Sequence, residues 1–488
     1  MNYLGIDLGT TNSVACTVKN GKYAYINFRN KELLPSAMLY KDGKISIGSI
    51  AKRKATIYPT NYISSSKTYM GSNEKKWQIE DRTFTPTDVA TEILHVIHDE
   101  AVKFFGNNDE IETVITTPAY FSSSQNAATA EAGKRAGFKV KQILAEPVAA
   151  AIAYAFDDLK TNEKIYVVDL GGGTFDVTLL EVSSNNEYRT LMKDGDNHLG
   201  GDDFDIAIYE LMLSHIRQDI GVDLSTEESS ELTPEAYSRA RQKLLQEAER
   251  VKCVLSDAEE DDISIMNLFP YRDGNYDFDM TLTRAAFMQA ASKLVRHVEN
   301  TIRDSLHNVE RSVDEVNRVI LVGGSANMPF IREYVEEFFH KKPYSDKDLS
   351  KLVAMGAALR ADGTRGDTIT LHDIIAHSLG IEIVGDRFSP ILIRGREYPC
   401  EEMKIYTTSH DYQEVVSIDV YEGEDENQIK NNYYYGGFQV DGIEKALEGI
   451  PKIEVTFSFD ESCILHVKAK DRKTGVSGAK DLAIHFGH

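Results

Sequence analysis

Two stretches of the sequence each place a carboxylate directly before a glycine turn. Residues 7–12 read DLGTTN, and residues 169–176 read DLGGGTFD. Because glycine has no Cβ, such a turn brings backbone N–H groups close to an anion, and the threonine hydroxyls add further donors. A third turn, VILVGGS at 319–325, has the same character. One Gly-Gly turn is usually an ordinary hairpin. Three glycine turns that each come after an apolar run indicate phosphate binding.

The carboxylates beside these turns predict a metal ion. Asp7, Asp169 and Asp176 would repel a phosphate unless a cation or a water molecule stood between them. Mg²⁺ keeps much of its hydration shell in proteins, so we expect these three side chains to hold Mg²⁺ through water. One of them could also orient an attacking water. No GxxxxGK[ST] motif is present, which excludes a P-loop.

The elements that must position these turns alternate between strands and helices as far as residue 360. Periodicity predicts helices over 88–106, from Pro234 to about Leu255, and from about Arg284 to Leu306. This is an α/β organisation with two lobes. Strands are expected at 3–8, 14–18, 113–118, 165–170, 175–182 and 318–323.

The C-terminal part of the sequence has a different pattern. In IEVTFSFD the apolar residues Ile453, Val455, Phe457 and Phe459 share one face of a strand. Several strands of this kind predict a small β-sandwich. We therefore expect a two-lobed domain at 1–363, a linker at 364–372 and a β-sandwich at 373–488.

Composition excludes several classes of function. The 488 residues carry a formal charge of −23, which would repel nucleic acid and anionic lipid. Four scattered cysteines without CxxC spacing favour a reducing compartment. No basic leader and no long apolar run are visible. A cytoplasmic protein that binds neither nucleic acid nor membrane is expected.

Several motifs together carry a resemblance to a known family. They are DLGTTNS (7–13), TPAYFSSSQ (117–125), EPVAAAIAYAF (146–156), DLGGGTFDV (169–177), GDNHLGGDDFD (195–205), VILVGGS (319–325), SLGIEI (378–383) and GGFQVDGI (436–443). In this order they resemble the 70-kDa heat-shock chaperones of the DnaK type. The stretches MGSNEKKW (70–77) and DRFSPIL (386–392) are most similar to the atypical bacterial HscC branch.

The resemblance implies a fold and an activity. It implies an α/β actin-like two-lobed ATPase domain followed by an all-β sandwich that binds extended hydrophobic peptides. The expected activity is hydrolysis of ATP to ADP and phosphate with Mg²⁺ and K⁺, coupled to the binding of unfolded clients. A J-domain co-chaperone and a nucleotide exchange factor are the other partners that it implies. No lid sequence follows the sandwich, so we expect bound peptide to leave quickly.

The resemblance also implies four groups of site residues. The hydrolysis group is Asp7, Lys67, Glu146, Asp169, Thr174 and Asp176. The nucleotide-contacting group is Gly9, Thr10, Thr11, Asn12, Gly171, Gly172, Gly173, Gly200, Gly201, Glu249, Lys252, Ser256, Gly323, Gly324, Ser325 and Asn327. The peptide-binding group is Ile381, Ile383, Val384, Ser409, Val416 and Ile418. Pro118, Asn126 and Asp373 form the coupling group.

Plainer interpretations of these residues stay open at this level. Lys67 alone would be a surface lysine. Glu249 and Lys252 would be a solvated helix face with a possible ion pair. The peptide-binding residues would be the core of the sandwich.

Some positions depart from the family pattern. The resemblance implies that Asn327 stands where an arginine usually stacks on adenine, and that Cys253 stands where some members carry a second arginine. The absence of both arginines predicts weaker nucleotide binding, since a stacked arginine is worth roughly 0.5–2 kcal/mol. Asn126 replaces the arginine partner of Pro118, and the linker has the polar residues Thr370 and His372. These changes predict weakened coupling between the domains.

Two other classes of protein share a two-lobed scaffold. One is a sugar kinase, which would need a catalytic Asp over a sugar pocket. The other is a filament or interaction protein whose assembly is controlled by nucleotide. Neither function explains the C-terminal β-sandwich, so its presence favours a chaperone over both.

Overall fold

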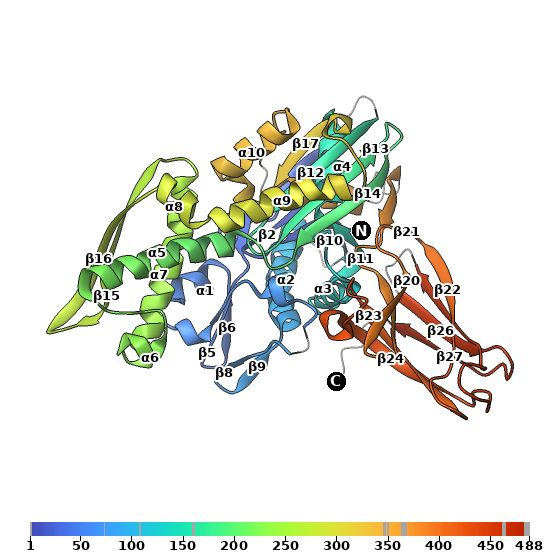
Figure 1. Ribbon diagram of the computed structural model, residues 1–488. Helices are drawn as coiled ribbons and strands as arrows, with labels where there is room; N and C mark the ends of the chain where they lie inside the picture. The colour runs from blue at the N-terminus through green and yellow to red at the C-terminus, as the bar shows by residue number, and fades with distance from the viewer. Residues whose placement is uncertain are drawn as a thin grey trace.

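The computed structural model describes residues 2–72, 74–106, 109–158, 162–344, 348, 351–362, 368–460 and 465–482. It contains two α/β lobes and a β-sandwich that lies beside α3 of the first lobe (Figure 1). Within these residues, no helix combines the length and the apolar character needed to cross a bilayer.

The sheet of lobe I is built around β1, whose neighbours are the parallel strand β10 and the antiparallel strand β2. Its strand order is β11-β10-β1-β2-β3, with β4 beside β2. The bounds are β1 Asn2–Leu8, β2 Asn12–Lys19, β3 Lys22–Tyr25, β4 Leu33–Pro35, β10 Ile111–Thr117 and β11 Lys139–Ala145. Register places Asp7 opposite Thr116 of β10.

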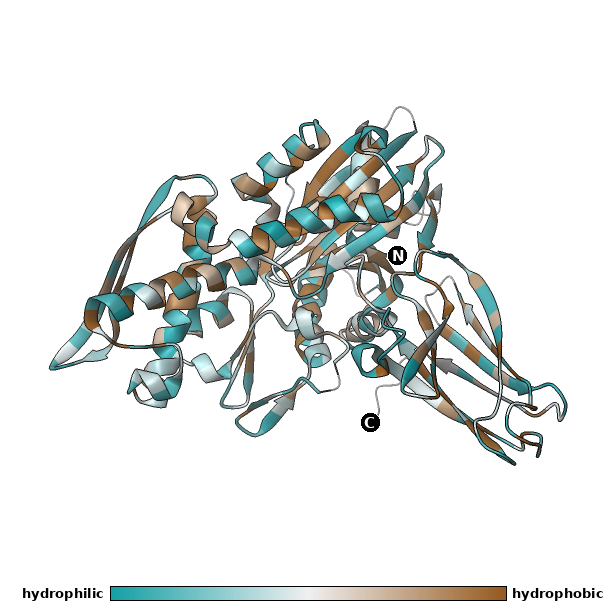
Figure 2. Ribbon diagram, viewed as in Figure 1, coloured by the Kyte–Doolittle hydropathy of each residue, from teal (hydrophilic) through white to brown (hydrophobic). Residues whose placement is uncertain are grey.

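The sheet of lobe II repeats this arrangement around β12, which is parallel to β17 and antiparallel to β13. Its order is β17-β12-β13-β14-β18-β21. The bounds are β12 Glu163–Leu170, β13 Phe175–Val182, β14 Glu187–Asp196, β17 Arg318–Val322, β18 Thr370–Ile374 and β21 Glu397–Tyr398. Asp7 and Asp169 are each the penultimate residue of a central strand, so the duplication in the sequence is a duplication in space. The strands of both sheets contain many apolar residues (Figure 2).

Two helices, α4 (Glu146–Asp158) and α11 (Leu352–Ala361), pack tightly between the two sheets. A Cβ on Gly356 would lie 1.7 Å from the carbonyl oxygen of Ala149, and one on Gly5 would lie 2.0 Å from the amide nitrogen of Ala358. Only glycine allows backbones to approach so closely. This contact joins the two lobes.

The predicted helices are confirmed, with one correction. Helix α7 spans Pro234–Leu255, as its periodicity predicts. Helix α2 spans Pro86–Phe105 and ends at Gly106, whose φ of 71° suits a left-handed cap. The single helix expected from Arg284 to Leu306 is wrong. It is α8 (Arg284–Ala290) followed by α9 (Ser292–Asn308), because buried Ala291 has a ψ of 3° that interrupts the helix.

The remaining elements of the two lobes flank these sheets. Strands β15 and β16 form a long hairpin that projects at the left of Figure 1. The bounds are α1 Ser49–Lys54, α3 Ser123–Arg135, α5 Gly201–Ile220, α6 Glu227–Ser230, α10 Pro329–Phe339, β5 Met38–Lys41, β6 Lys44–Ile47, β7 Tyr62–Ile63, β8 Trp77–Ile79, β9 Arg82–Phe84, β15 Glu260–Tyr271 and β16 Gly274–Thr283.

The β-sandwich consists of two sheets with strand orders β20-β19-β23-β24 and β22-β25-β26-β27. Ile453, Val455, Phe457 and Phe459 are all buried, as their alternation predicts. The bounds are β19 Leu379–Ile383, β20 Arg387–Leu392, β22 Cys400–Tyr406, β23 Val415–Glu422, β24 Tyr433–Asp441, β25 Ile453–Phe459, β26 Leu465–Asp471 and β27 Ser477–Leu482.

Part of the expected linker is a strand. Strand β18 pairs in parallel with β14, with Thr370 opposite Glu187 and His372 opposite Arg189. It thereby extends the sheet of lobe II toward the β-sandwich. Residues 363–367 of the expected boundary region lie outside the described part of the chain, so the domain limits stay a prediction.

Candidate functional site

The ends of β1 and β12 and the start of β13 bring the half-buried Asp7 together with the buried Asp169 and Asp176 between the lobes. Asp169 and Asp176 are 4% and 1% exposed, and they lie opposite each other in the β12–β13 pair. Asp7 lies within hydrogen-bond reach of the Thr116 hydroxyl, at 3.5 Å. The Tyr120 amide donates to Asp176 over 2.9 Å.

A buried ion pair adjoins these carboxylates. The Lys67 Nζ atom lies 2.6 Å from the Glu146 Oε1 atom, and the two side chains are 6% and 9% exposed. Lys67 is held by a short turn at Ser66–Tyr69, and Glu146 is the first residue of α4. Lys67 is therefore not the surface lysine of the plainer interpretation.

The surroundings keep these carboxyls from ionising easily. Burial, then the Glu146 carboxylate, raises the pKa of Asp7 to about 7. The same two causes raise the pKa of Asp176 to about 8 and hold that of Asp169 well above its usual range. Among the described residues, Asp169 Oδ2 and Asp176 Oδ2 are buried without a hydrogen-bond partner. These orphaned oxygens and the excess of negative charge fit a hydrated cation.

The glycine turns of the two lobes lie against each other. A Cβ on Gly172 would lie 2.0 Å from the Thr11 hydroxyl oxygen, and one on Gly173 would lie 2.9 Å from the methyl group of Thr10. Thr10 and Thr174 are 5% and 4% exposed. The structure thus brings the two predicted phosphate turns into contact.

Helix α5 begins directly on the second of these turns. The amides of Gly201 and Asp202 donate to the carbonyls of Gly171 and Gly172 over 2.9 and 2.7 Å. A Cβ on Gly200 would lie 2.4 Å from the Gly173 amide nitrogen. The N-terminus of this 20-residue helix therefore faces the turns, where its dipole favours an anion.

A small cavity lies beside Lys67. It measures about 10 Å³ and is lined in part by Gly9, Thr10, Ser66 and Lys67. This is close to the lower limit for holding one water molecule. Its position would allow the Lys67 ammonium to orient a water.

The predicted adenosine residues make ion pairs, but not with each other. Glu249 binds Lys52 of α1 over 2.6 Å, across the two lobes. Lys252 binds Asp205 over 2.8 Å and also donates to the Gly201 carbonyl. The ion pair between Glu249 and Lys252, which the sequence left as a possibility, is therefore not formed. No sequence pattern identifies Lys52 or Asp205 as a site residue, because Glu249 and Lys252, with which they pair, lie dozens to hundreds of residues away in the sequence.

Two hydrogen bonds join the lobes near the Lys52–Glu249 ion pair. Gln246 of α7 donates to the Lys52 carbonyl over 2.9 Å, and the Ser65 hydroxyl donates to Asp202. Burial raises the pKa of Asp205 to about 7, although Lys252 opposes this shift.

The third turn and its neighbours occupy the wall of lobe II. Gly323 has a φ of 84°, and a Cβ there would lie 2.3 Å from the Leu170 carbonyl oxygen. The Asn327 amide donates to Gly324 over 3.2 Å, and the Ser256 hydroxyl donates to the Lys252 carbonyl over 3.2 Å. Ser325 is buried, while Cys253 is exposed.

The coupling residues lie where the β-sandwich meets the lobes. Asn126 accepts a hydrogen bond from the Thr117 hydroxyl over 2.8 Å, next to Pro118. Asp373 of β18 binds Lys193 of β14 over 2.7 Å, and Lys193 is 6% exposed. Burial would raise the pKa of Asp373, but Lys193 lowers it below its usual value.

Tyr120 connects the acidic cluster to the β-sandwich. Its amide holds Asp176, and its carbonyl accepts from His377 Nε2 over 3.1 Å. The rings of Tyr120 and His377 lie 4.2 Å apart, and the Arg394 guanidinium lies over the Tyr120 ring. Sequence reasoning missed Tyr120 and His377, since neither stands out by type or spacing.

The predicted peptide-binding residues divide into two sets. Ile381, Val416 and Ile418 are buried in the core of the sandwich, as the plainer interpretation expects. Ile383 and Ser409 are half-buried, and Val384 is 76% exposed. Only the second set reaches the surface, so the peptide site stays a prediction.

Comparisons with known proteins cover nearly the whole chain. A family model described as "Hsp70 protein" matches residues 3–484. The chain is 36% identical over 512 aligned positions to "Chaperone protein dnaK" of Cyanidioschyzon merolae, covering 98% of this chain and 82% of that protein. The same identity and coverage of this chain hold for the proteins of that name from Cyanidium caldarium and Prochlorococcus marinus, of which 81% and 78% are covered.

Proposed function

This chain belongs to the Hsp70 family, and from that premise we propose which of its residues carry out the family's reaction. The protein is an ATP-dependent chaperone with an actin-like ATPase domain and a β-sandwich, and it binds unfolded client polypeptides. A kinase or filament function is not favoured. The observation that carries the site proposal is the buried acidic cluster between two glycine turns.

We assign the phosphates to these turns. Gly9 to Asn12 and Gly171 to Thr174 would offer backbone and hydroxyl donors, and the N-terminus of α5 would add its dipole. The Thr174 hydroxyl would lie nearest to the γ-phosphate. Gly200, Gly201, Gly323, Gly324 and Ser325 complete this cradle.

Asp7, Asp169 and Asp176 would hold Mg²⁺ through water. When bound, Mg²⁺ neutralises charge on the phosphates and on these carboxylates. The four carboxyl groups of this cluster, including Glu146, outnumber the Lys67 ammonium and the Lys193 ammonium that also acts on Asp176, so we propose that K⁺ supplies further positive charge.

Lys67 and Glu146 would prepare the attacking water. The Glu146 carboxylate fixes the Lys67 ammonium at 2.6 Å, next to the small cavity. The ammonium can then donate a hydrogen bond to a water there and orient one of its lone pairs. Positioning and electrostatic stabilisation supply most of the catalysis in phosphoryl transfer.

The adenosine would lie between the lobes, near Glu249, Lys252, Ser256 and Asn327. Lys52 and Asp205 hold the first two side chains in place. The ion pair between Lys52 and Glu249 bridges the lobes, and its opening would accompany nucleotide exchange.

We assign peptide binding and interdomain coupling to residues outside the nucleotide site. Extended peptide would bind beside Ile383, Val384 and Ser409. Pro118, Asn126 and Asp373 would couple the domains. A J-domain protein and an exchange factor would be the partners, and the scattered thiols favour a cytoplasmic location.

Single-turnover hydrolysis of labelled ATP tests the site. Lys67→Ala and Thr174→Ala should each lower the rate at least a hundredfold in the presence of Mg²⁺, because each removes a group beside the reacting atoms. Lys103→Ala, on the exposed face of α2, is the matched control. Turnover in the two site variants equal to that of the control would refute the assignment.

A further inference from the structure

Glu422 is a buried acid that the proposed mechanism does not use. It is the last residue of β23 and is 6% exposed. Its carboxyl accepts a hydrogen bond from the Ser123 amide, at the start of α3 in lobe I. Among the described residues, its Oε2 atom has no hydrogen-bond partner. The β-sandwich therefore docks on lobe I with an acid group sealed in the interface.

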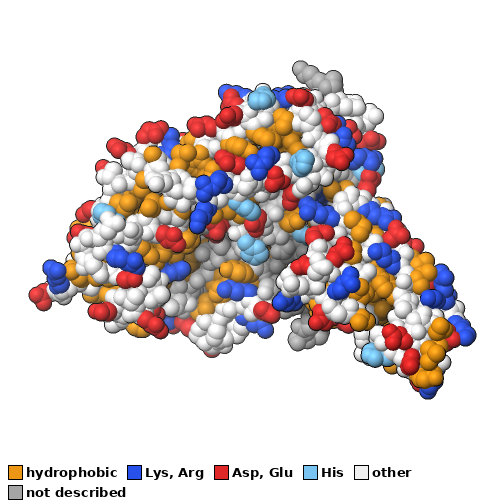
Figure 3. Space-filling model, in the orientation of Figure 1, with side chains coloured by type: hydrophobic (Ala, Val, Ile, Leu, Met, Phe, Trp, Pro, Cys, Tyr) orange, Lys and Arg blue, Asp and Glu red, His pale blue; other side chains and the backbone are white. Residues whose placement is uncertain are grey.

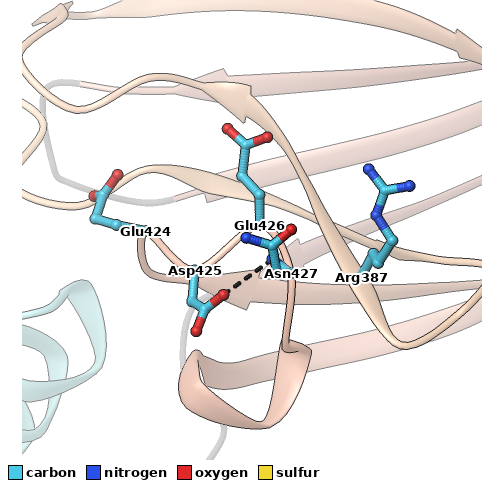
Figure 4. A pocket seen from close by; sticks show the side chains of 5 residues that line it. All are labelled: Arg387, Glu424, Asp425, Glu426 and Asn427. Carbon is cyan, nitrogen blue, oxygen red and sulfur yellow. Dashed lines mark hydrogen bonds between the residues drawn. The ribbon is translucent and has the colours of Figure 1, made fainter.

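The groups that face Glu422 do not neutralise a negative charge. Across the strands, Leu379 of β19 and Tyr433 of β24 lie opposite it. Glu424, in the following loop, adds a second carboxylate, and no described residue forms an ion pair with Glu422. Figure 4 shows that Glu424 points away from Arg387, on the other side of the loop. A carboxylate in this place would be buried and unpaired.

The neutral acid suits this environment better. Burial, with a contribution from Glu424, raises the pKa of Glu422 to about 8, although the Ser123 amide opposes the shift. The start of α3 would favour an anion through its dipole, and this effect opposes the shift in the same direction as the Ser123 amide. Once the domains separate, the side chain meets water and its pKa returns toward the ordinary value of 4.5.

We propose that docking of the β-sandwich on lobe I takes up a proton at Glu422, so that the interdomain contact weakens as the pH rises. The site is the contact between Glu422 and the N-terminus of α3, and the ligand is the proton. A rise in pH removes the proton, and the buried carboxylate then opposes docking.

Docking of the β-sandwich and protonation of Glu422 are thermodynamically linked. A carboxyl with a raised pKa in the docked state favours docking fully below its undocked pKa, and this contribution is lost as the pH rises toward 8. The interface also contains His377, whose pKa burial lowers from 6.5, and the charged pairs Lys193–Asp373, Arg394–Asp194 and His372–Glu397. His377 is therefore neutral above pH 6.5, and the comparison of the wild type with Glu422→Gln isolates the contribution of Glu422 between pH 6.5 and 8. Uptake of one proton changes the docking equilibrium about tenfold per pH unit.

Hydrogen exchange of β18 measures docking in the intact chain with MgATP. Strand β18 lies between the lobe II sheet and the β-sandwich, so its amides should lose protection when the domains separate. After correction for the intrinsic exchange rate, protection in the wild type should fall up to tenfold per unit between pH 6.5 and 8. Glu422→Gln keeps the shape without the charge and should give a flat profile.

Glu401→Gln, at an exposed acid of β22, is the matched control and should behave like the wild type. A flat wild-type profile would overturn the proposal, and so would an unchanged slope in Glu422→Gln. Glu422→Ala provides a second variant, which should also lose the slope. Because the readout is docking rather than ATP turnover, its outcome is independent of the catalytic assignments.

Discussion

At the scale of single residues, the site depends on charges that have partners in the interior. Lys67 and Glu146 are both less than a tenth exposed and form a 2.6 Å ion pair. Such a pair contributes little net stability compared with an apolar pair of similar volume, but removal of one partner leaves an uncompensated buried charge. Substitution of Lys67 alone and joint substitution of Lys67 and Glu146 should therefore differ in their effect on thermal stability, while both abolish ATP hydrolysis.

Lys67→Met should lower the thermal midpoint of the ATPase domain, corresponding to a loss of about 3–5 kcal/mol, because Glu146 remains buried without its counter-charge. The double variant Lys67→Met, Glu146→Leu should recover part of this stability without recovering ATP turnover. Thermal unfolding followed by circular dichroism measures the midpoints. A single variant as stable as the exposed control Lys103→Met would contradict the buried pair.

Gly200→Ala should weaken ATP binding at least tenfold, since a Cβ there would lie 2.4 Å from the Gly173 amide nitrogen and displace the phosphate turn. Gly274→Ala is the matched control, because a Cβ at that position meets no atom within 4 Å. Isothermal titration calorimetry with ATP compares the two. Equal affinity in both variants would show that the turn does not hold phosphate.

Residues with local signals could be predicted from the sequence, whereas their distant partners could not. The two Asp-Leu-Gly turns stand out because an apolar run precedes each of them. The sequence contains no such mark for Lys52, which lies in a basic helix and pairs with Glu249 across 197 positions. Lys67 was identified only through the family resemblance, since its burial depends on how lobe I folds around it.

At the scale of elements, hydrogen bonds to side chains fix the ends of strands and turns. Asp471 ends β26 with a fully buried side chain, which accepts from the amides of Glu444, Lys473 and Thr474 at 2.7, 2.7 and 3.2 Å. Burial would raise the pKa of Asp471, but these three donors lower it below its usual value.

Asp471→Ala should destabilise the β-sandwich by about 1–3 kcal/mol, because three backbone donors lose their acceptor. In the wild type, the depressed pKa adds stability above pH 4 that is lost as the pH falls through the folded-state value. Urea unfolding at pH 7 and at pH 3 should therefore show a smaller difference between variant and wild type at pH 3. If the variant and the wild type differed equally in unfolding free energy at pH 7 and at pH 3, the Asp471 carboxylate would not be the acceptor that stabilises this turn.

The periodicity of apolar residues predicts the limits of some helices and strands correctly and misses others. Helix α7 has its predicted limits because Pro234 and the apolar stripe define it locally. The sequence predicts residues 370–372 of β18 only as linker, since the pairing of these three residues with β14 joins residues about 183 positions apart (370 − 187). The break at Ala291 was missed because alanine is an ordinary helix former.

At the scale of the whole molecule, the β-sandwich touches the ATPase domain through charged and polar contacts. Positive and negative side chains are interspersed on the face shown in Figure 3. Lys193 binds Asp373, Arg394 contacts Asp194 at 3.3 Å, and Tyr433 donates to the Gly71 carbonyl. Despite the polar linker, the structure therefore contains a continuous interface between the domains.

Asp373→Asn should weaken this interface, because Lys193 would stay buried without its counter-charge. The expected result is at least a tenfold loss of β18 protection in hydrogen exchange. Asp419→Asn, at an acid of β23, is a control within the sandwich that leaves the Lys193 contact in place. Unchanged protection in Asp373→Asn would mean that this pair does not hold the domains together.

We infer that peptide binding in the β-sandwich acts on the acidic cluster through the docked interface despite Asn126 and the polar linker, because His377 donates to the Tyr120 carbonyl and the Tyr120 amide donates to Asp176. Single-turnover ATP hydrolysis by the wild type, with and without an extended leucine-rich peptide, measures this coupling. We predict hydrolysis that requires Mg²⁺ and becomes several-fold faster with peptide. Hydrolysis that proceeds at the same rate with and without saturating peptide would contradict this coupling.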